Sequence, residues 1–412
     1  MLNLLVWAAW GTVLLWAFGA LLTLHALTRQ KPLEPAAPSG PLMTGDAPLV
    51  SILVPARNEE HRVLDHCIRS FLSQDYGRFE VVAVNDRSTD ATASILRAIA
   101  RADERLKVVE GVEPPAGWLG KPHALQEGFE ASSGEWALAT DADMIFEKTA
   151  VRTAVAHALK GNYDAVTLIP SVVCLSFWER VFMPAFGWFM LMVLPVHRVN
   201  DPRRPESLGV GGFFLIRRAA LKGVGEYGAV RAEVAEDLRM GEILKGAGAR
   251  LRLEYAPALA STRMQTNFRE IWEGFTKNLF AGAKFNLFQT LAGGIAVTLF
   301  AVAPLLVAVA SLLALLAGAQ GEWLRLFVPT FIVWTIQVAI FALINRWSEV
   351  PVAYAFTVPL GYALFVAILF NSAVRIATGR GVTWKGRRLY ERAGVRPPRG
   401  TPPTPDLPVA DE

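Results

Sequence analysis

The stretch that decides the fold is Val50-Ser-Ile-Leu-Val-Pro-Ala-Arg-Asn-Glu-Glu60, a short apolar run that ends in polar and acidic residues. Two further runs have the same form, Glu80-Val-Val-Ala-Val-Asn-Asp-Arg-Ser-Thr-Asp90 and Glu135-Trp-Ala-Leu-Ala-Thr-Asp-Ala-Asp-Met144. Such runs are typical of buried parallel strands, and open α/β sheets bind ligands at the carboxyl ends of their strands. The sequence therefore predicts an α/β domain whose three acidic strand ends meet in one crevice. A nucleotide with a divalent metal ion best suits so many carboxylates, because hard cations bridge oxygen ligands to a diphosphate.

The composition indicates a membrane component. Of 412 residues, 52% are hydrophobic and 19% are charged, which is too apolar for an ordinary soluble protein. Residues 2–27 form a nearly uncharged run, long enough at about 1.5 Å per residue to cross a hydrocarbon core of about 30 Å. This run lacks a basic n-region and a small-residue cleavage site, so it predicts a retained anchor rather than a cleaved signal peptide.

Three more runs of spanning length lie in the C-terminal third of the chain, and the segments between the runs differ in composition. The predicted spans are residues 290–317, 326–344 and 352–378. The predicted organisation is a transmembrane helix at 1–28, a Pro-rich linker at 29–48, an α/β domain at 49–288, transmembrane helices at 289–378, and a basic, then Pro-rich tail at 379–412.

Basic residues near the membrane ends predict the orientation. Arg29 and Lys31 follow the first span, so the α/β domain is expected on the cytoplasmic side of an integral membrane protein, at the inner membrane if the source is bacterial. Three C-terminal spans would then place the tail outside, although residues 375–392 are strongly basic and predict a cytoplasmic tail. A re-entrant segment or an additional span would resolve this conflict, so the number and parity of the spans stay open.

Residues 172–199 are rich in aromatic side chains and methionine. Aromatic amphipathic helices lie in the membrane interface, so this segment predicts an interfacial element within the α/β domain that would receive a lipid beside the crevice. A large buried core helix is the alternative, because aromatic and methionine stripes usually pack inside proteins.

Cysteine content and charge exclude other classes of protein. Cys67 and Cys174 have neither a metal-binding spacing nor a disulfide framework. The net charge of +4 and the pI of about 9.1 do not indicate nucleic acid as a partner, because the basic residues gather at membrane flanks. Anionic lipid headgroups are the expected contacts of these residues.

Five short motifs together resemble the inverting family 2 glycosyltransferases, in the family's order and over roughly residues 48 to 290. They are Pro55-Ala-Arg-Asn-Glu-Glu60, Asn85-Asp-Arg-Ser-Thr-Asp90, Gly120-Lys-Pro-His-Ala-Leu125, Thr140-Asp-Ala-Asp143 and Glu236-Asp237. The membrane-bound members that glycosylate ceramides, hopanoids or carotenoids are the most similar. The resemblance implies a GT-A fold and transfer of one sugar, with inversion, from a nucleotide-sugar donor to a lipid acceptor. The expected donor is a UDP-sugar, with Mg²⁺ or Mn²⁺ as the cofactor.

The motif Thr140-Asp-Ala-Asp143 resembles the family's DxD element. We expect Asp141 and Asp143 to face the same side, because residues two apart at the end of a strand point in one direction. The resemblance makes both residues metal ligands, with Asp143 the more direct one, and Asp141 also a donor-site residue. A metal ion held there neutralises charge on the departing nucleoside diphosphate. A turn with two solvated carboxylates is the alternative.

The resemblance assigns Pro55, Arg57, Glu59, Asp86 and Lys121 to the nucleotide side of the site. A carboxylate such as that of Asp86 can accept hydrogen bonds from uracil or from ribose hydroxyls. For Lys121, which would hold the phosphates, a solvated loop lysine is the alternative.

For Asp90 we prefer a structural role at the start of the helix predicted over residues 91–101. By resemblance Asp237 is the catalytic base, which takes the proton of the acceptor hydroxyl. A carboxylate that merely begins the helix over residues 238–245 is the alternative.

One family element is incomplete. Arg269 and Trp272 keep a cation and an aromatic ring, but they stand three apart instead of adjacent, so their roles stay open. The missing motif argues against a polysaccharide synthase, which remains an alternative, as does a non-catalytic nucleotide-sugar-binding membrane protein. A transporter is disfavoured because the predicted spans contain almost no charged residues.

Overall fold

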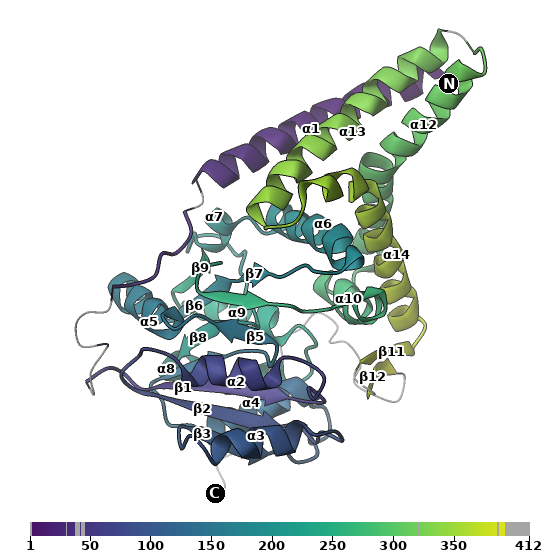
Figure 1. Cartoon of the computed structure of the whole chain (residues 1–412). Helices are drawn as coiled ribbons and strands as arrows, with labels where there is room; N and C mark the ends of the chain where they lie inside the picture. Colours follow the sequence, from purple (N-terminus) through teal and green to yellow (C-terminus); the bar gives the residue numbers. More distant parts are fainter. Residues whose placement is uncertain are drawn as a thin grey trace, which may run out of the picture. The chain divides into compact units, whose positions relative to one another are not determined.

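The computed structural model describes residues 2–29, 31–37, 42, 46–319, 321–384 and 387–391. The chain forms two compact units. The helical unit contains the described residues of Met1–Lys31, Cys174–Val193 and Gln265–Val382, and the α/β unit contains those of Pro32–Val173, Leu194–Met264 and the segment from Thr383 onward. Each unit is therefore assembled from segments that are far apart in the sequence (Figure 1).

The α/β unit is built on a seven-stranded mixed sheet with the order β3-β2-β1-β4-β8-β6-β9. β1 pairs in parallel with both β2 and β4, β2 pairs in parallel with β3, and β8 runs antiparallel between β4 and β6. The strands are β1 (Val50–Ala56), β2 (Phe79–Asn85), β3 (Leu106–Glu110), β4 (Trp136–Ala139), β6 (Ala165–Ile169), β8 (Phe214–Arg217) and β9 (Leu251–Tyr255). The three apolar runs are thus adjacent parallel strands, as the sequence predicts.

Helices cover both faces of this sheet. They are α2 (Leu64–Leu72), α3 (Thr92–Ala100), α4 (Gly120–Glu130), α5 (Ala150–Gly161), α7 (Val196–Val199), α8 (Arg218–Gly223), the 3₁₀ helix η2 (Glu226–Val230) and α9 (Glu236–Gly246). A second, three-stranded sheet contains β5 (Met144–Phe146), β10 (Ala260–Thr262) and β7 (Ser171–Val172).

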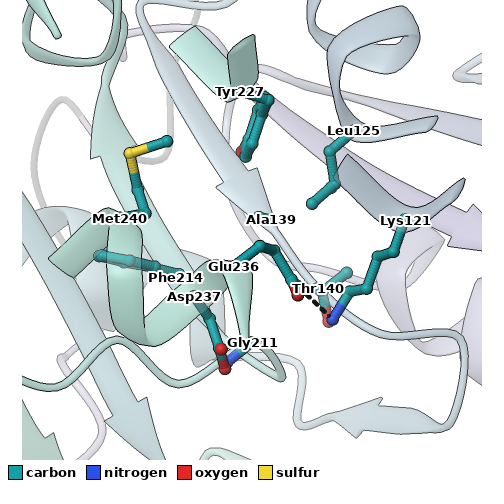
Figure 2. Close-up of a pocket in the computed structure, with 10 residues that line it drawn as sticks. All are labelled: Lys121, Leu125, Ala139, Thr140, Gly211, Phe214, Tyr227, Glu236, Asp237 and Met240. Atoms are coloured by element: carbon teal, nitrogen blue, oxygen red, sulfur yellow. Dashed lines mark hydrogen bonds and ion pairs between the residues drawn. The ribbon is translucent and has the colours of Figure 1, made fainter. Parts of the chain in front are cut away.

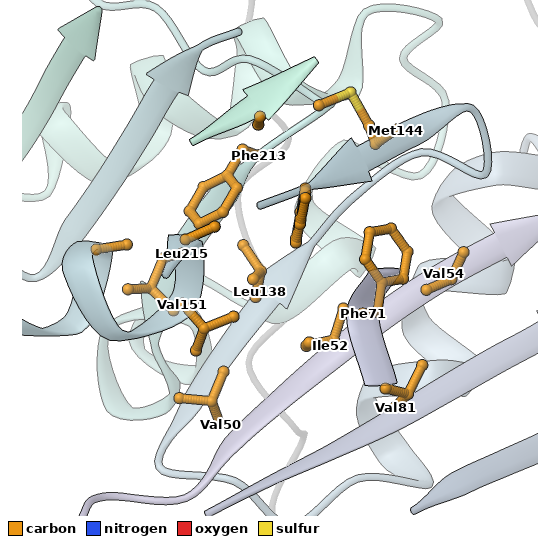
Figure 3. Packing of buried hydrophobic residues seen from close by; sticks show 14 of the residues in the cluster. Val50, Ile52, Val54, Phe71, Val81, Leu138, Met144, Val151, Phe213 and Leu215 are labelled. Atoms are coloured by element: carbon orange, nitrogen blue, oxygen red, sulfur yellow. The ribbon is translucent and has the colours of Figure 1, made fainter. Parts of the chain in front are cut away.

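Strand alternation divides the core into two layers. Val50, Ile52 and Val54 of β1 point into the layer shared with α2, α3 and α5, where Phe71 is completely buried (Figure 3). Leu53, between them, points into the opposite layer with α4, α8 and α9. A strand buried on both faces is apolar wherever no polar partner is available, which explains the nearly continuous apolar run, and its one polar side chain, Ser51, donates to Glu80 over 2.6 Å.

The described part of the predicted linker lies along the α/β unit. Leu33 donates its backbone N–H to the carbonyl of Tyr255 over 2.7 Å, and the buried side chain of Arg152 donates to the carbonyl of Ala36 over 2.8 Å. Arg152 also pairs with Asp75 at 3.0 Å. Residues 32–37 are therefore attached to the α/β unit. The Pro-rich tail at 397–412 lies outside the described residues, and the basic segment before it includes β11 (Arg380–Trp384) and β12 (Arg387–Glu391).

The helical unit contains four stretches that are long and apolar enough to cross a membrane: Asn3–Thr28, Leu287–Leu316, Glu322–Trp347 and Val352–Ala377. These stretches confirm the predicted apolar helices. The elements of the unit are α1 (Leu2–Arg29), α6 (Phe177–Val193), α10 (Phe268–Gly282), α11 (Leu287–Val297), the π-helix η3 (Thr298–Val302), α12 (Ala303–Leu316), α13 (Glu322–Trp347), the 3₁₀ helix η4 (Val352–Thr357) and α14 (Val358–Ala377).

At the irregular helical turn η3, neighbouring helices donate hydrogen bonds to two backbone carbonyl groups. Pro304, just after η3, has no N–H to donate to the preceding turn. The Trp16 Nε1–H of α1 donates to the carbonyl of Phe300 over 2.7 Å, and the Gln337 side chain of α13 donates to the carbonyl of Ala301 over 3.1 Å. Backbone groups freed in an apolar environment need such partners, so these two bonds tie α1 and α13 to the α11–α12 stretch.

Helix α6 belongs to the helical unit, although its sequence lies within the predicted α/β domain. It begins with a capping box, in which Ser176 Oγ accepts from the Glu179 N–H over 3.3 Å and Glu179 accepts from the Ser176 N–H over 2.5 Å. Gly361 of α14 lets the two helices approach closely, because a Cβ there would lie 2.5 Å from the carbonyl oxygen of Val181. Of the predicted 172–199 segment, residues 172–173 and 194–199 belong to the α/β unit.

Candidate active site

The site lies at one edge of the large sheet. Because β1, β2 and β4 are parallel, their carboxyl ends share this edge, and the loops 57–62, 86–91 and 140–143 follow them. The three acidic strand ends therefore meet where the sequence predicts a crevice.

The Asp141/Asp143 motif lies in a turn, which differs from the expectation of a strand end. β4 already ends at Ala139, so strand alternation does not orient the two carboxylates. Instead, Thr140 Oγ1 anchors the turn by donating to the carbonyl of Gly212 over 2.7 Å. Asp143 Oδ2 lies 3.3 Å from the guanidinium of Arg62, and Asp141 Oδ1 lies 2.7 Å from Lys121 Nζ.

Lys121 is the second residue of α4 and contacts two carboxylates. Its Nζ lies 2.7 Å from Asp141 Oδ1 and 2.6 Å from Glu236 Oε1, so it is not a solvated loop lysine. Burial opposes the charge of Lys121, but the carboxylates of Asp141, Glu236 and Asp237 outweigh it and hold the pKa of Lys121 above its usual range. Burial raises the pKa of Glu236, and the Lys121 ammonium opposes that rise. Lys121 therefore stays a cation.

Asp237 is oriented by backbone N–H groups. It is the second residue of α9, and its Oδ2 accepts from the Gly211 N–H over 2.7 Å while its Oδ1 accepts from the Leu238 N–H over 2.8 Å. A helix N-terminus stabilises a carboxylate at this position. The arrangement fixes the direction of the carboxylate, which a proton acceptor requires.

Gly211 lies where the charged side chains converge. A Cβ on this residue would be 2.9 Å from Asp237 Oδ2, 3.2 Å from Lys121 Nζ and 3.5 Å from Asp141 Oδ2. Any larger residue would therefore displace at least one of these groups. Figure 2 shows Lys121, Glu236 and Asp237 around this glycine.

A small pocket of about 10 Å³ lies beside these charges (Figure 2). It is lined by Lys121, Leu125, Ala139, Thr140, Gly211, Phe214, Tyr227, Glu236, Asp237 and Met240. Tyr227 is buried, and among the described residues its hydroxyl has no hydrogen-bond partner. The pocket has room for about one water molecule, which such a hydroxyl would hold.

The loops after β1 and β2 form a second group of predicted site residues. The Arg57 guanidinium donates to the carbonyls of Asp86 and Arg87 over 2.7 and 3.2 Å, so Arg57 joins the two loops. Arg87 adopts a left-handed backbone with φ 53°, and its guanidinium folds back onto Asp86 Oδ1 at 3.1 Å. Pro55 is in β1 opposite Val84. This loop pair presents Asp86 at the edge of the sheet.

Arg62 links the two groups. Its guanidinium lies 3.3 Å from Asp143 and 4.0 Å from the buried Glu59. The loop after β2 contains Asp90, whose carboxylate accepts from the backbone N–H groups of Thr92 and Glu60 over 3.0 and 3.1 Å. Asp90 thus stabilises the start of α3, which is the structural role predicted for it from the sequence.

The residues present fit a divalent cation that the substrate helps to hold. Within the described ranges, no cluster of three or more His, Cys, Asp or Glu side chains could hold a metal ion by itself. Asp141 and Asp143 each already contact a side-chain cation, Lys121 and Arg62, which shows that the turn attracts positive charge. Mg²⁺ typically takes one or two carboxylates and completes its shell with phosphate oxygens and water.

Four residues lie at the site beyond those predicted from the sequence: Gly211, Glu236, Arg62 and Tyr227. Glu236 stands next to Asp237, and Gly211 belongs to the glycine-rich stretch before β8, so their positions offered a signal. Arg62 lies in the loop that follows β1, but its contact with Asp143 depends on tertiary packing, and the position of Tyr227 offered no signal. Arg269 and Trp272 lie on α10 in the helical unit, where Arg269 pairs with Glu273 at 2.9 Å.

Comparison with known families identifies the class of the domain. The sequence model of Glycosyl transferase family 2 matches residues 51–225. These residues are therefore a family 2 glycosyltransferase domain, which confirms the resemblance seen in the motifs.

A curated relative and a solved structure extend the comparison. The 4,4'-diaponeurosporenoate glycosyltransferase of Staphylococcus aureus strain USA300 is 27% identical over 238 residues, which cover 57% of this chain and 61% of the relative. The matched part is thus less than two thirds of that relative. A mannosyltransferase from Pyrobaculum calidifontis, solved in complex with GDP-Man and Mn²⁺, aligns with a TM-score of 0.54 and 20% identity over 91% of this chain and 98% of its own. This likeness shows the shared fold and confirms the predicted GT-A class.

Proposed function

We propose that the protein is a membrane-bound glycosyltransferase that moves one sugar, with inversion, from a nucleotide-diphosphate sugar to a lipid hydroxyl. The observation that carries the proposal is the convergence of Lys121, Asp141 and Asp237 around Gly211, in an α/β unit whose residues 51–225 match the family 2 glycosyltransferase model. A base, a cation and a proposed metal ligand are the groups that displacement at an anomeric carbon requires.

In the proposed reaction, Asp237 accepts the proton of the acceptor hydroxyl. The acceptor oxygen forms a bond to the anomeric carbon from one face while the bond to the diphosphate oxygen breaks on the other, which inverts the configuration. Lys121 lies on the side of Asp141 and balances charge on the leaving diphosphate. Mg²⁺ or Mn²⁺ bound at Asp141 and Asp143 would supply further charge neutralisation. No second carboxylate is needed as an acid, unlike in paired-carboxylate hydrolases.

Donor recognition is assigned to the loops after β1 and β2. Asp86 would accept a hydrogen bond from the uracil ring or from ribose, with Arg57, Glu59 and Pro55 forming the surrounding loop. A UDP-sugar is the proposed donor. The Pyrobaculum calidifontis structure contains GDP-Man and Mn²⁺, which supports a nucleotide sugar with a metal ion for this type of fold.

The helical unit offers a surface for a lipid acceptor. Five rings form a continuous series, here called the aromatic ladder, with successive centroids 5.9, 5.2, 4.8 and 5.9 Å apart. In order they are Tyr354, Phe177, Trp178, Phe268 and Trp272. Phe177 and Phe268 are 47% and 39% exposed. Half-exposed aromatic rings at helix ends are typical of the membrane interface, where lipid headgroups lie.

The remaining part of α6 has the character of a packed core. Trp188 stacks on Trp16 with centroids 5.4 Å apart and donates to Thr23 Oγ1 over 2.9 Å. Phe186 packs on Phe275. Each of the two interpretations of the aromatic segment is therefore supported by one part of α6. The first turn has the character of an interfacial helix, and the later turns have that of a buried core helix.

Replacing Phe177 and Phe268 together with serine should reduce sugar transfer to a long-chain lipid about tenfold, because each ring would lose apolar contact with the acceptor or bilayer. Hydrolysis of the donor and transfer to a short, water-soluble analogue should change less than about threefold. The matched control is Phe288→Ser, which removes an exposed ring at the start of α11. Equal losses with both acceptors would contradict the lipid-acceptor assignment and favour a polysaccharide synthase-like acceptor.

Packing within the helical unit helps to decide how many of its helices cross the membrane. α1 and α12 pack on α13, whereas α14 packs on α6, α10 and α11. Asn371 of α14 donates to Thr276 Oγ1 of α10 over 3.0 Å, and Ser372 Oγ donates to the carbonyl of Thr276 over 2.5 Å. Helix α10 contains four charged residues between Arg269 and Lys277, which exclude this helix from the hydrocarbon core. We infer that α14, like α10, does not cross the membrane.

The inferred topology has three crossings: α1, the α11–α12 stretch and α13. The chain then returns after α13 to the side it occupied before α11, which is the side of the α/β unit. The basic segment from Arg375 then lies on the same side, and the positive-inside rule makes that side cytoplasmic. This topology removes the conflict between the span count and the basic tail.

Protease-cleavable tags in sealed inverted vesicles test the topology. A tag after residue 412 and a tag in the surface loop 101–105 should be cleaved together, whereas a tag in the loop 317–321 between α12 and α13 should be protected. Protection of the C-terminal tag together with the 317–321 tag would instead indicate that α14 crosses the membrane.

A further inference from the structure

Glu236 is a buried carboxylate that the proposed reaction does not use. Its side chain is 5% exposed, and its Oε1 lies 2.6 Å from Lys121 Nζ. In the described part of the chain, Lys121 is the one cation that contacts it. Leu125, Phe214 and Met240 line the pocket around this ion pair. A buried charge is costly unless it is paired, so Glu236 and Lys121 hold each other in place.

The two carboxylates that contact Lys121 differ in exposure. The Asp141 side chain is 36% exposed, whereas that of Glu236 is 5% exposed. Asp141 can therefore exchange its partner with solvent and solutes, and Glu236 cannot. A divalent cation that binds Asp141 must compete with the Lys121 ammonium for the same carboxylate.

We propose that the Lys121 ammonium acts as a built-in cation that occupies Asp141 before a divalent metal ion arrives, and that Glu236 is the positioning residue that retains Lys121 when Asp141 is released to the metal. The inference rests on the proposed function, in which Asp141 is a metal ligand. Lys121 then remains in the site, beside the position of the leaving diphosphate, instead of moving into solvent.

The burial of Glu236 strengthens its hold on Lys121 during this exchange. The interaction between two charges grows as the surroundings become less polar, so the Glu236 carboxylate is a strong partner for Lys121 even after Asp141 is lost. The nearby Tyr227 hydroxyl and the pocket of about 10 Å³ leave room for about one water molecule. Such a water would hydrate the pair without separating it.

The proposal predicts that substitutions of Glu236 and Lys121 have non-additive effects on the Kd for Mn²⁺. In Glu236→Gln, Lys121 keeps Asp141 as its remaining carboxylate contact and should compete harder with the metal, so the Kd for Mn²⁺ should rise about tenfold. In Lys121→Met, the competing cation is gone and Mn²⁺ should bind about tenfold more tightly. In the Lys121→Met background, adding Glu236→Gln should change the Kd by less than about threefold.

The measurement is Mn²⁺ binding to the full chain in detergent, followed by the electron paramagnetic resonance signal of free Mn²⁺, without nucleotide and at fixed pH and ionic strength. Glu242→Gln is the matched control, because it removes a carboxylate from the same helix that pairs with Arg239 at 2.8 Å. Glu236→Asp, which keeps the charge, should retain near wild-type affinity. If Glu236→Gln does not fold, the Lys121→Met and Glu236→Asp results decide the inference.

The inference would be overturned if Glu236→Gln changed the Kd for Mn²⁺ equally in the wild type and in the Lys121→Met background. Weaker Mn²⁺ binding in Lys121→Met than in the wild type would also overturn it. So would the absence of Mn²⁺ binding in both proteins. Sugar transfer measured on the same preparations reports separately on the proposed function. Transfer without the coupling overturns only this inference, whereas coupling without transfer overturns the proposed reaction and leaves the exchange at Asp141 supported.

Discussion

Asp237→Asn should lower the rate of sugar transfer by about 100-fold or more while leaving nucleotide-sugar binding within about threefold of the wild type. An asparagine has nearly the same shape as an aspartate, and its side-chain oxygen can still accept the 2.7 Å hydrogen bond from the Gly211 N–H. It cannot take up the proton of an acceptor hydroxyl. The change therefore removes the base and preserves most of the local geometry.

Single-turnover transfer and equilibrium binding of the donor separate the two quantities. Glu242→Gln, on the same helix, is expected to leave both unchanged. Loss of donor binding in Asp237→Asn, with an unchanged single-turnover rate, would reassign Asp237 to the donor site.

Asp143→Ala should lower kcat about 1000-fold, because it removes a carboxylate that would hold the metal ion opposite the leaving diphosphate. Excess chelator should abolish transfer by the wild type, and Mg²⁺ or Mn²⁺ should restore it. Asp103→Ala is the control, since it removes a carboxylate that pairs with Arg105 in the loop before β3.

Part of the effect of Asp143→Ala could arise from the Arg62 guanidinium, which loses its contact with Asp143. It lies 3.3 Å from Asp143 Oδ2, so Asp143→Ala also releases a cation near the site. Arg62→Met tests this effect by itself and should change transfer far less than Asp143→Ala. Full turnover in excess chelator, or equal losses in Arg62→Met and Asp143→Ala, would remove the metal from the mechanism.

Local sequence patterns predicted the large features because each depends on neighbours in the chain. The continuous apolar run Val50–Ala56 implied a strand buried on both faces, and both core layers of the α/β unit contain its residues. Uninterrupted apolar stretches likewise predicted the four long helices. The family motifs identified the domain class that residues 51–225 confirm.

The details of the site were less accessible from sequence. Strand alternation was expected to align Asp141 and Asp143, but β4 ends at Ala139 and a hydrogen bond from Thr140 to Gly212 sets the turn instead. Residue spacing reports direction only where the backbone is regular. In a turn, a contact from a distant segment decides where a side chain points.

The assignment of residues 172–199 shows the same limit at a larger scale. Their composition indicated an aromatic helix but not its partners, and Gly361, nearly 180 positions later, permits the close packing of α6 on α14 in the helical unit. Phe177 is exposed in the aromatic ladder while Trp188 stacks on Trp16, so one helix serves both as surface and as core. No local sequence pattern distinguishes the exposed aromatic residues of this helix from the packed ones.

Sequence alone thus established which segments form strands and apolar helices, and which carboxylates stand at the ends of strands, because these properties follow from local periodicity and backbone direction. Tertiary structure alone decided that Lys121 is shared by Asp141 and Glu236, and that Gly211 leaves the space in which they meet Asp237. Those contacts join residues from α4, the turn after β4, the loop before β8 and the start of α9. Charges separated by about 100 residues interact only after burial of the apolar strands has brought their loops to one edge of the sheet.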